Sequence, residues 1–307
     1  MKRMNSRPAA ALCALLLLVL LCVPTLADSG PKAQLIVRVK HAPDEPYYLD
    51  LLEEGEYGGP SYGSGDSPYC GIDWNYPDER ADALDPALLD ALRAAIPAGW
   101  HACTAQGTNG VPMNGQLYAE SADAAGNPLH VFSYMGVPER YRILMVTQSG
   151  QVFVSEPLER RVLQSSAAVD WAAKTVSVPP VWVGCGLQFL ATLLPTLAVE
   201  GALAFLFGYR ARKSWQALLG VNLLTQGALA LYLAVTVLRH GVTGWSMIFF
   251  LPAELVITAV ECGLYCRLLT EQSKARAVVY GLCANVCSAA AGACLALPVW
   301  RWVVSIS

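Results

Sequence analysis

Charged residues are scarce in this chain. Asp, Glu, Lys and Arg make up 15% of its 307 residues, whereas soluble domains carry about 25%. Hydrophobic residues make up 54% of the chain. A shortage of charge on this scale indicates segments that cross a membrane rather than a single very large soluble core.

Two motifs that would mark a nucleotide-binding protein or a zinc protease are also absent from the sequence. It contains no Gly-x-x-x-x-Gly-Lys-Ser/Thr and no His-Glu-x-x-His. No Cys-x-x-Cys occurs, and the four histidines stand singly. We therefore predict no catalytic residues, no metal site and no cofactor, and we favour a protein that is not an enzyme.

Basic residues are few in the N-terminal half. Residues 28–179 contain 20 acidic but only 10 basic residues, and Arg80 is the only cation between Asp44 and Asp90. Binding to nucleic acid through its phosphates needs a basic surface, so we predict that nucleic acid is not a partner.

The N-terminus has the pattern of a secretory signal. Lys2 and Arg3 precede an apolar run at residues 9–23, and the small residues Thr25 and Ala27 suit cleavage by signal peptidase. We predict that residues 1–27 are a signal peptide. The domain that follows is then exported, whether the signal is cleaved or stays as an anchor.

Residues 28–179 predict a mainly β, sandwich-like extracytoplasmic domain with one short helix. Asp85 as N-cap and Pro86 at the first helical position predict a helix that runs to about Ala95. Alternating apolar residues predict strands at residues 34–40, 47–52, 129–135, 141–148 and 151–155.

A long segment of this domain, residues 53–82, is rich in Gly, Tyr and acidic residues. Such a stretch is either a disordered or plain surface loop or a binding loop. Tyr and Gly together suit an adaptable recognition surface. The aromatic residues that would form it are Tyr57, Tyr62, Tyr69, Trp74 and Tyr76.

The same domain holds two cysteines, Cys70 and Cys103. An oxidising exterior favours a disulfide between them, and two free thiols are the alternative.

Residues 180–307 contain four apolar segments, and each is long enough to cross a ~30 Å hydrocarbon core. Lys and Arg gather in the loops at residues 208–214 and 267–276, which places both loops in the cytoplasm. We therefore predict a multi-pass cell-membrane protein whose N-terminal domain and C-terminus are outside. The predicted transmembrane helices are residues 181–207, 215–238, 245–266 and 277–300.

Polar residues interrupt these apolar segments, and such residues usually face the interior of a helix bundle. They are Glu200, Asn222, Gln226, Glu254, Glu261 and Asn285. At 1.5 Å per residue, four of them lie about 9–13 Å from the cytoplasmic helix ends, so we expect one polar site there. The site either joins the helices by hydrogen bonds or binds a proton, a cation or an amine.

Three functions remain open at this stage. We favour an extracytoplasmic subunit that binds a ligand or an envelope partner and is anchored in lipid by four helices. The second is a small transporter or channel component that uses the intramembrane Glu and Asn residues and forms a homo-oligomer, because four spans are few for transport. The third is a membrane enzyme that uses two Glu residues as acid and base.

Overall fold

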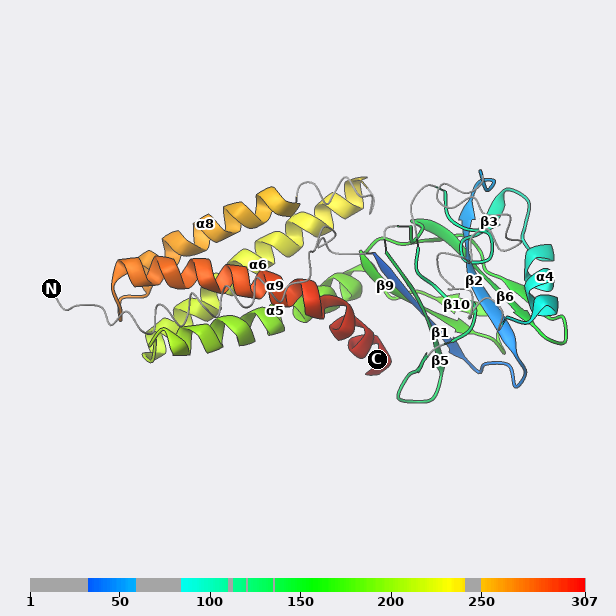
Figure 1. The fold of residues 1–307 in the computed structure, drawn as a ribbon, viewed down its shortest axis with the longest axis horizontal. Coiled ribbons are helices and arrows are strands. Elements are labelled where there is room, and N and C mark those ends of the chain that lie inside the picture. Colours follow the sequence, from blue (N-terminus) through cyan, green and yellow to red (C-terminus); the bar gives the residue numbers. More distant parts are fainter. Residues whose placement is uncertain are drawn as a thin grey trace. The chain divides into compact units, whose positions relative to one another are not determined.

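The computed structural model describes residues 33–58, 84–109, 113–119, 121–134, 136–240 and 250–306. They form two compact units. A β-rich unit is built mainly from Lys32–Leu187, and a helical unit from Gln188–Leu233 and Met247–Val299. Figure 1 shows strands in the first and long helices in the second. The predicted signal peptide and most of the predicted recognition loop lie outside the described residues.

The first sheet of the β-rich unit has the strand order β10–β9–β1–β5–β4. Its central strand β1 pairs antiparallel with β5 and parallel with β9. Leu35 and Ile36, which point to opposite faces of β1, are both buried, so both faces of this strand are covered. The strands are β1 (Gln34–Lys40), β4 (Ser121–Ala122), β5 (Pro128–Ser133), β9 (Gln164–Asp170) and β10 (Thr175–Ser177).

The second sheet has the order β3–β2–β6–β7, and β8 also pairs with β6. On one face, Leu52 and Leu144 pack against helix α4 (Pro86–Ala94). On the other face, Leu49 and Met145 are also fully buried. Figure 1 shows α4 beside β2 and β6. The strands are β2 (Tyr47–Glu54), β3 (Trp100–Ala102), β6 (Arg140–Thr147), β7 (Val152–Val154) and β8 (Leu158–Glu159).

The mainly β character of the described part of this unit and the predicted helix that begins at Pro86 are confirmed. Asp85 caps the helix, because its Oδ1 accepts a hydrogen bond of 2.8 Å from the Ala87 N–H. One boundary was wrong. Strand β2 continues to Glu54, inside the segment predicted as a loop, because Glu53 and Glu54 pair with β3. The sequence also does not predict β3, β4, β8, β9 or β10.

The helical unit contains α5 (Val181–Leu206), α6 (Arg212–His240), α8 (Phe250–Leu268) and α9 (Lys274–Ile306). Two stretches, Val181–Leu206 and Arg212–Thr236, are long and apolar enough to cross a membrane, judged by length and composition. The sequence predicts four spans. Helix α8 does not meet the same criterion because its 19 residues include Glu254, Glu261 and Arg267.

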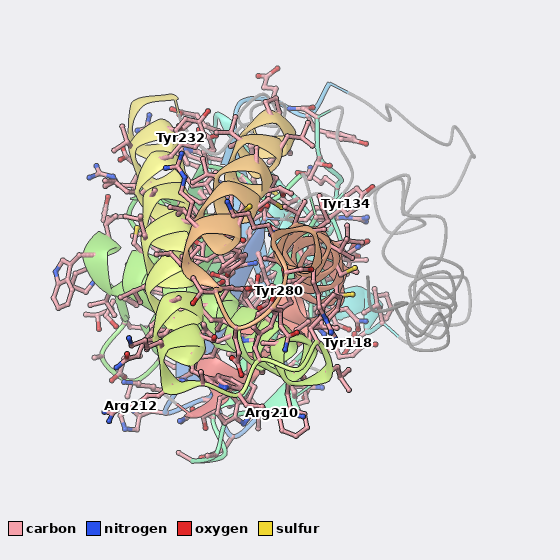
Figure 2. The ribbon with its side chains drawn as sticks, turned by 90° about the vertical axis from the view of Figure 1, so that its left-hand side faces the viewer. Tyr118, Tyr134, Arg210, Arg212, Tyr232 and Tyr280 are labelled. Atoms are coloured by element: carbon pink, nitrogen blue, oxygen red, sulfur yellow. The ribbon has the colours of Figure 1, made fainter. Side chains whose placement is uncertain are left out.

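Glu271 joins the two loops at one end of the helical unit. Its carboxylate accepts hydrogen bonds from the N–H groups of Arg210 and Ala211, at 2.8 and 2.9 Å, and from the Ser214 hydroxyl at 2.9 Å. These bonds, the backbone ones above all, lower the pKa of Glu271. A negative charge here also stabilises the N-terminus of α6. In Figure 2, Arg210 and Arg212 lie at the edge of this unit, whereas Tyr280 lies between helices.

His130 gives the β-rich unit a measurable dependence on pH. It is buried on β5, its Nε2 lies 3.1 Å from the Tyr47 hydroxyl, and burial lowers its pKa to about 4. The folded state therefore keeps the ring neutral, whereas the unfolded chain binds a proton below about pH 6.5. The stabilisation is complete above that pH and is lost as the pH falls towards 4.

We expect the wild type to lose about 3 kcal/mol of unfolding free energy between pH 7 and pH 4 relative to a His130→Gln variant. Urea titration of the full chain in detergent, read by pulse proteolysis, measures this difference. Carboxylates that titrate in both proteins cancel in the comparison. Parallel pH profiles for the two proteins would contradict the assignment.

Candidate functional site

Glu200 of α5 lies inside the helical unit, where the residue is 1% exposed. Its Oε2 accepts a hydrogen bond of 2.7 Å from Asn222 Nδ2 on α6 and one of 3.1 Å from the Tyr265 hydroxyl on α8. Asn222 Nδ2 also lies 3.0 Å from the Tyr265 hydroxyl oxygen. These three buried side chains therefore tie α5, α6 and α8 together.

Glu261 of α8 is the second buried carboxylate and is 0% exposed. Its Oε1 accepts a hydrogen bond of 2.5 Å from the Thr225 hydroxyl on α6. Its Oε2 accepts one of 2.7 Å from Asn285 Nδ2 on α9. The Asn285 Oδ1 in turn accepts from the Thr258 hydroxyl at 3.2 Å. This second set of bonds ties α6, α8 and α9 together.

The two sets form one structure because they share two helices. Asn222 and Thr225 are three residues apart on α6, and Glu261 and Tyr265 are four residues apart on α8, so each pair lies on one helical face. We call the whole the carboxylate network. It consists of Glu200, Asn222, Thr225, Glu261, Tyr265 and Asn285.

Every donor to the two carboxylates is neutral. Across the described segments, no Lys, Arg or His side chain forms an ion pair with Glu200 or Glu261. The Oδ1 of Asn222 is buried and has no hydrogen-bond partner. A buried charge without a counter-ion and a buried acceptor without a donor are both costly. A proton on one carboxyl would reduce both costs, since that carboxyl could then donate.

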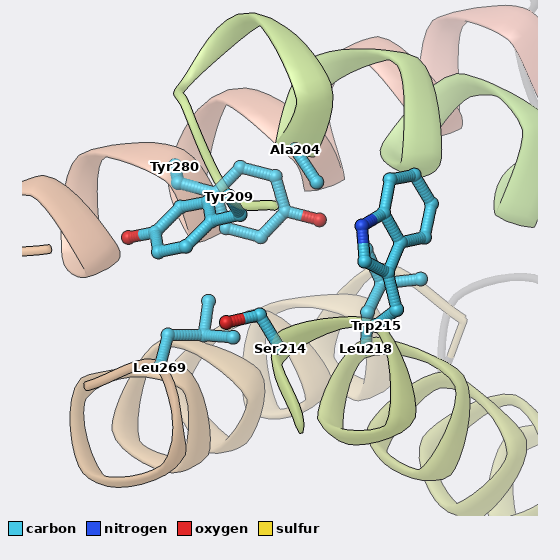
Figure 3. Close-up of a pocket in the computed structure, with 7 residues that line it drawn as sticks. All are labelled: Ala204, Tyr209, Ser214, Trp215, Leu218, Leu269 and Tyr280. Carbon is cyan, nitrogen blue, oxygen red and sulfur yellow. The ribbon is translucent and has the colours of Figure 1, made fainter. Parts of the chain in front are cut away.

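Aromatic side chains pack beside the network. The Tyr280 hydroxyl donates to the backbone carbonyl of Glu200 at 3.2 Å, and its ring centre lies 5.3 Å from that of Tyr265 and 5.5 Å from that of Tyr209. Figure 3 shows a small pocket between these helices, with Tyr280 and Trp215 in its wall. It has no room for a water molecule, and no network residue lines it. Binding of a proton by the carboxylate network does not require a pocket that holds water.

The structure brings together four of the six polar residues selected from the sequence: Glu200 with Asn222, and Glu261 with Asn285. The other two are half-buried, and no hydrogen bond of the described residues joins them to the network. They are Gln226 and Glu254. The sequence did not predict Thr225 or Tyr265 as members of this site. The only feature that could have indicated them is their position, one helical turn after Asn222 and after Glu261, respectively.

The remaining site predictions fall in the β-rich unit. Cys103 is buried, and Cys70 lies outside the described residues, so their disulfide stays a prediction. Of the predicted recognition residues only Tyr57 is described, and its ring centre lies 5.9 Å from that of His101. The others, which the structure does not describe, are Tyr62, Tyr69, Trp74 and Tyr76.

Comparison with known proteins gives no relative: no family model, no curated protein and no solved structure matches this chain. Inferences about its function therefore depend on the geometry described above.

The network predicts unequal effects for two similar substitutions on α6. Asn222→Leu removes one of the two donors to Glu200 and should destabilise the helical unit by about 1–2 kcal/mol, the upper range for hydrogen bonds between membrane helices. Gln226→Leu, one turn further along, should change stability by less than about 0.5 kcal/mol. Unfolding of the full chain in mixed detergent micelles measures both. Equal losses in the two variants would show that the network does not hold the helices together.

Proposed function

We propose that this chain is an integral membrane protein in which all four helices cross the bilayer. The distribution of polarity supports this, because polar side chains such as Glu200 and Glu261 are buried inside the helical unit, whereas many large apolar side chains are exposed on its surface. Like α5 and α6, helices α8 and α9 expose large apolar side chains. Leu255 and Val256 on α8 are 72% and 63% exposed, and Leu282 on α9 is 48% exposed. Such a surface is stable against lipid and costly against water.

In this proposal the loops at residues 208–214 and 267–276 lie in the cytoplasm. Both loops are rich in Lys and Arg, and Glu271 joins them by hydrogen bonds. Cations collect on the cytoplasmic side of membrane proteins. The β-rich unit precedes the first helix and the C-terminus follows the fourth, so both lie outside the cell.

We infer that the protein is a non-enzymatic subunit of a membrane or envelope complex. The β-rich unit binds a ligand or partner outside the cell, and the helices anchor it and contact a second membrane protein or a second copy. The observation that carries this inference is the exposed apolar surface on all four helices around an interior that is closely packed. A protein partner and lipid are the two surfaces that such side chains accept.

Photo-crosslinking in native membranes tests this function. A photoreactive residue replaces Leu224 or Leu255, which are 64% and 72% exposed, and a matched control replaces buried Leu203, which is 7% exposed. We expect a discrete protein adduct from at least one exposed position and none from position 203. Adducts with lipid alone at both exposed positions would contradict the subunit proposal. The mass of the adduct separates a second copy from a different protein.

A small transporter or channel component is the second candidate. The carboxylate network favours it, because two buried carboxylates with neutral donors can take up and release protons. In this candidate Glu200 and Glu261 share protons within an oligomer, and Asn222 and Asn285 hold whichever carboxyl is ionised.

We expect proton binding in the network to depend on two of the three intramembrane glutamates. Infrared difference spectra of the reconstituted protein between acid and alkaline pH should show a protonated-carboxyl band that is lost in Glu200→Gln or Glu261→Gln. Glu254→Gln is the matched control and should retain the band. Proton flux into liposomes that disappears in the same two variants would support the transporter. Absence of flux in the wild type would rule the transporter out while leaving the proton site intact.

A further inference from the structure

Three side chains with metal-binding atoms meet on the second sheet of the β-rich unit. Glu53 on β2 lies directly opposite His101 on β3. Cys103 follows and continues the pairing, since its N–H donates to the Leu51 carbonyl at 2.8 Å. Ala102 packs into the core beneath α4, so His101 and Cys103 share the opposite face. The ligand atoms of Glu53, His101 and Cys103 all lie within 4.8 Å of one another.

The ring of His101 is fixed so that its Nε2 points towards this group. Its Nδ1 lies 3.0 Å from the Gly55 carbonyl oxygen, which can only accept, so Nδ1 carries the proton of the neutral ring. Gly55 has a φ of 112°, which favours glycine, and its N–H is bound to the Gly99 carbonyl. The carbonyl that sets the ring is therefore itself held by the backbone.

The other ring nitrogen, Nε2, faces a carboxylate. His101 is 1% exposed, and its Nε2 lies 3.1 Å from Glu53 Oε2, so these two atoms form a hydrogen bond only when Nε2 carries a proton. With the proton on Nδ1, a nitrogen lone pair faces a carboxylate oxygen, and the two repel each other. A positive charge between these atoms would reverse that repulsion.

We propose that Glu53, His101 and Cys103 bind a divalent transition-metal ion, best matched by Zn²⁺. Imidazole nitrogen, thiolate sulfur and carboxylate oxygen are the ligands that zinc takes in proteins. Bonds of about 2.0–2.3 Å at tetrahedral angles place ligand atoms roughly 3.3–3.8 Å apart, within reach of this group after small side-chain rotations. The bond from Nδ1 to a backbone carbonyl is the usual support of a zinc-bound histidine.

Three protein ligands leave a fourth position for water or for a group on a bound molecule. The Glu53 side chain is 32% exposed, so the ion can enter from solvent on that side. Burial, together with the charges of Asp50 and Glu53, raises the pKa of the Cys103 thiol. Binding therefore breaks the S–H bond as the Zn–S bond forms, and the thiol proton leaves to solvent. No electron is transferred.

Two other occupants compete for the same atoms. A proton on Nε2 would form an ion pair between His101 and Glu53, and a disulfide from Cys103 to Cys70 would consume the thiol. Either one excludes the metal ion, so the experiment must separate all three.

The test uses the full-length protein in detergent, purified without reductant, stripped with a chelator and titrated with Co²⁺ as a spectroscopic probe. We expect about one Co²⁺ per chain, with a thiolate-to-cobalt absorption band and the visible bands of a tetrahedral ion, all displaced by Zn²⁺. Cys103→Ser should abolish the thiolate band. Glu53→Gln and His101→Gln should weaken binding at least tenfold. The control His41→Gln removes an exposed histidine, paired with Asp170, and should leave binding unchanged.

A second measurement guards against variants that fail to fold. Zn²⁺ should raise the Tm of the wild type and of His41→Gln but not of Glu53→Gln, whose side chain is partly exposed. Mass spectrometry of a non-reduced digest reports the state of Cys103. A Cys70–Cys103 disulfide, or a thiolate band that persists in Cys103→Ser, would overturn the proposal.

Discussion

The packing of the helices depends on two carboxylates that are buried among neutral hydrogen-bond donors. Glu200 and Glu261 cannot reach water, so every hydrogen bond that they accept must come from a neighbouring helix. Asn222 supplies one to Glu200, and Thr225 supplies one to Glu261, both from α6. A slide of α6 by one turn, about 5.4 Å, would break both bonds together. The network therefore fixes both the rotation and the height of the helices.

Other features of the helical unit follow from this requirement. Tyr280 donates to the backbone carbonyl of Glu200, and its ring packs at 62° to that of Tyr209 and at 57° to that of Tyr265. Such ring contacts are worth about 0.5–1.5 kcal/mol each. Glu271 then holds the loop ends by accepting from the start of α6. If only apolar contacts joined them, these helices could turn about their own axes, because many of their outward side chains are also apolar. The polar and aromatic contacts select one arrangement, which leaves the outward apolar surface free to meet lipid or a partner.

The sequence predicts the parts of this structure that depend on local pattern. Alternation located β1 at its observed bounds, and the Asp85–Pro86 pair located α4, because a strand period and a helix cap are properties of a few adjacent residues. Depth counting also selected residues that the structure joins, since rise per residue is constant in a helix. Strand β9 was missed because its Gln-Ser-Ser-Ala-Ala-Val-Asp sequence has little apolar alternation and owes its conformation to parallel pairing with the distant β1.

Partners of a buried group are harder to predict than the group itself. A glutamate in an apolar segment is conspicuous, whereas Thr225 and Tyr265 are ordinary residues of such a segment until helix rotation is known. The sequence analysis selected Gln226 as a polar residue one turn from Asn222 and did not select Thr225. Four residues from Asn222 turn the helix by about 400° and three by about 300°, and only the packed structure decides which side faces Glu261.

The two sites share one electrostatic condition, although they are built differently. In the helical unit, carboxylates are surrounded by neutral donors, and the buried Asn222 Oδ1 has no donor. In the β-rich unit, His101 Nε2 lies 3.1 Å from the Glu53 carboxylate. We propose a cation for each arrangement: a proton for the closely packed helical unit, and a metal ion for the partly exposed sheet edge, where a thiol is available. In these two proposals, the space around each acceptor and the softness of its ligands decide which cation it takes.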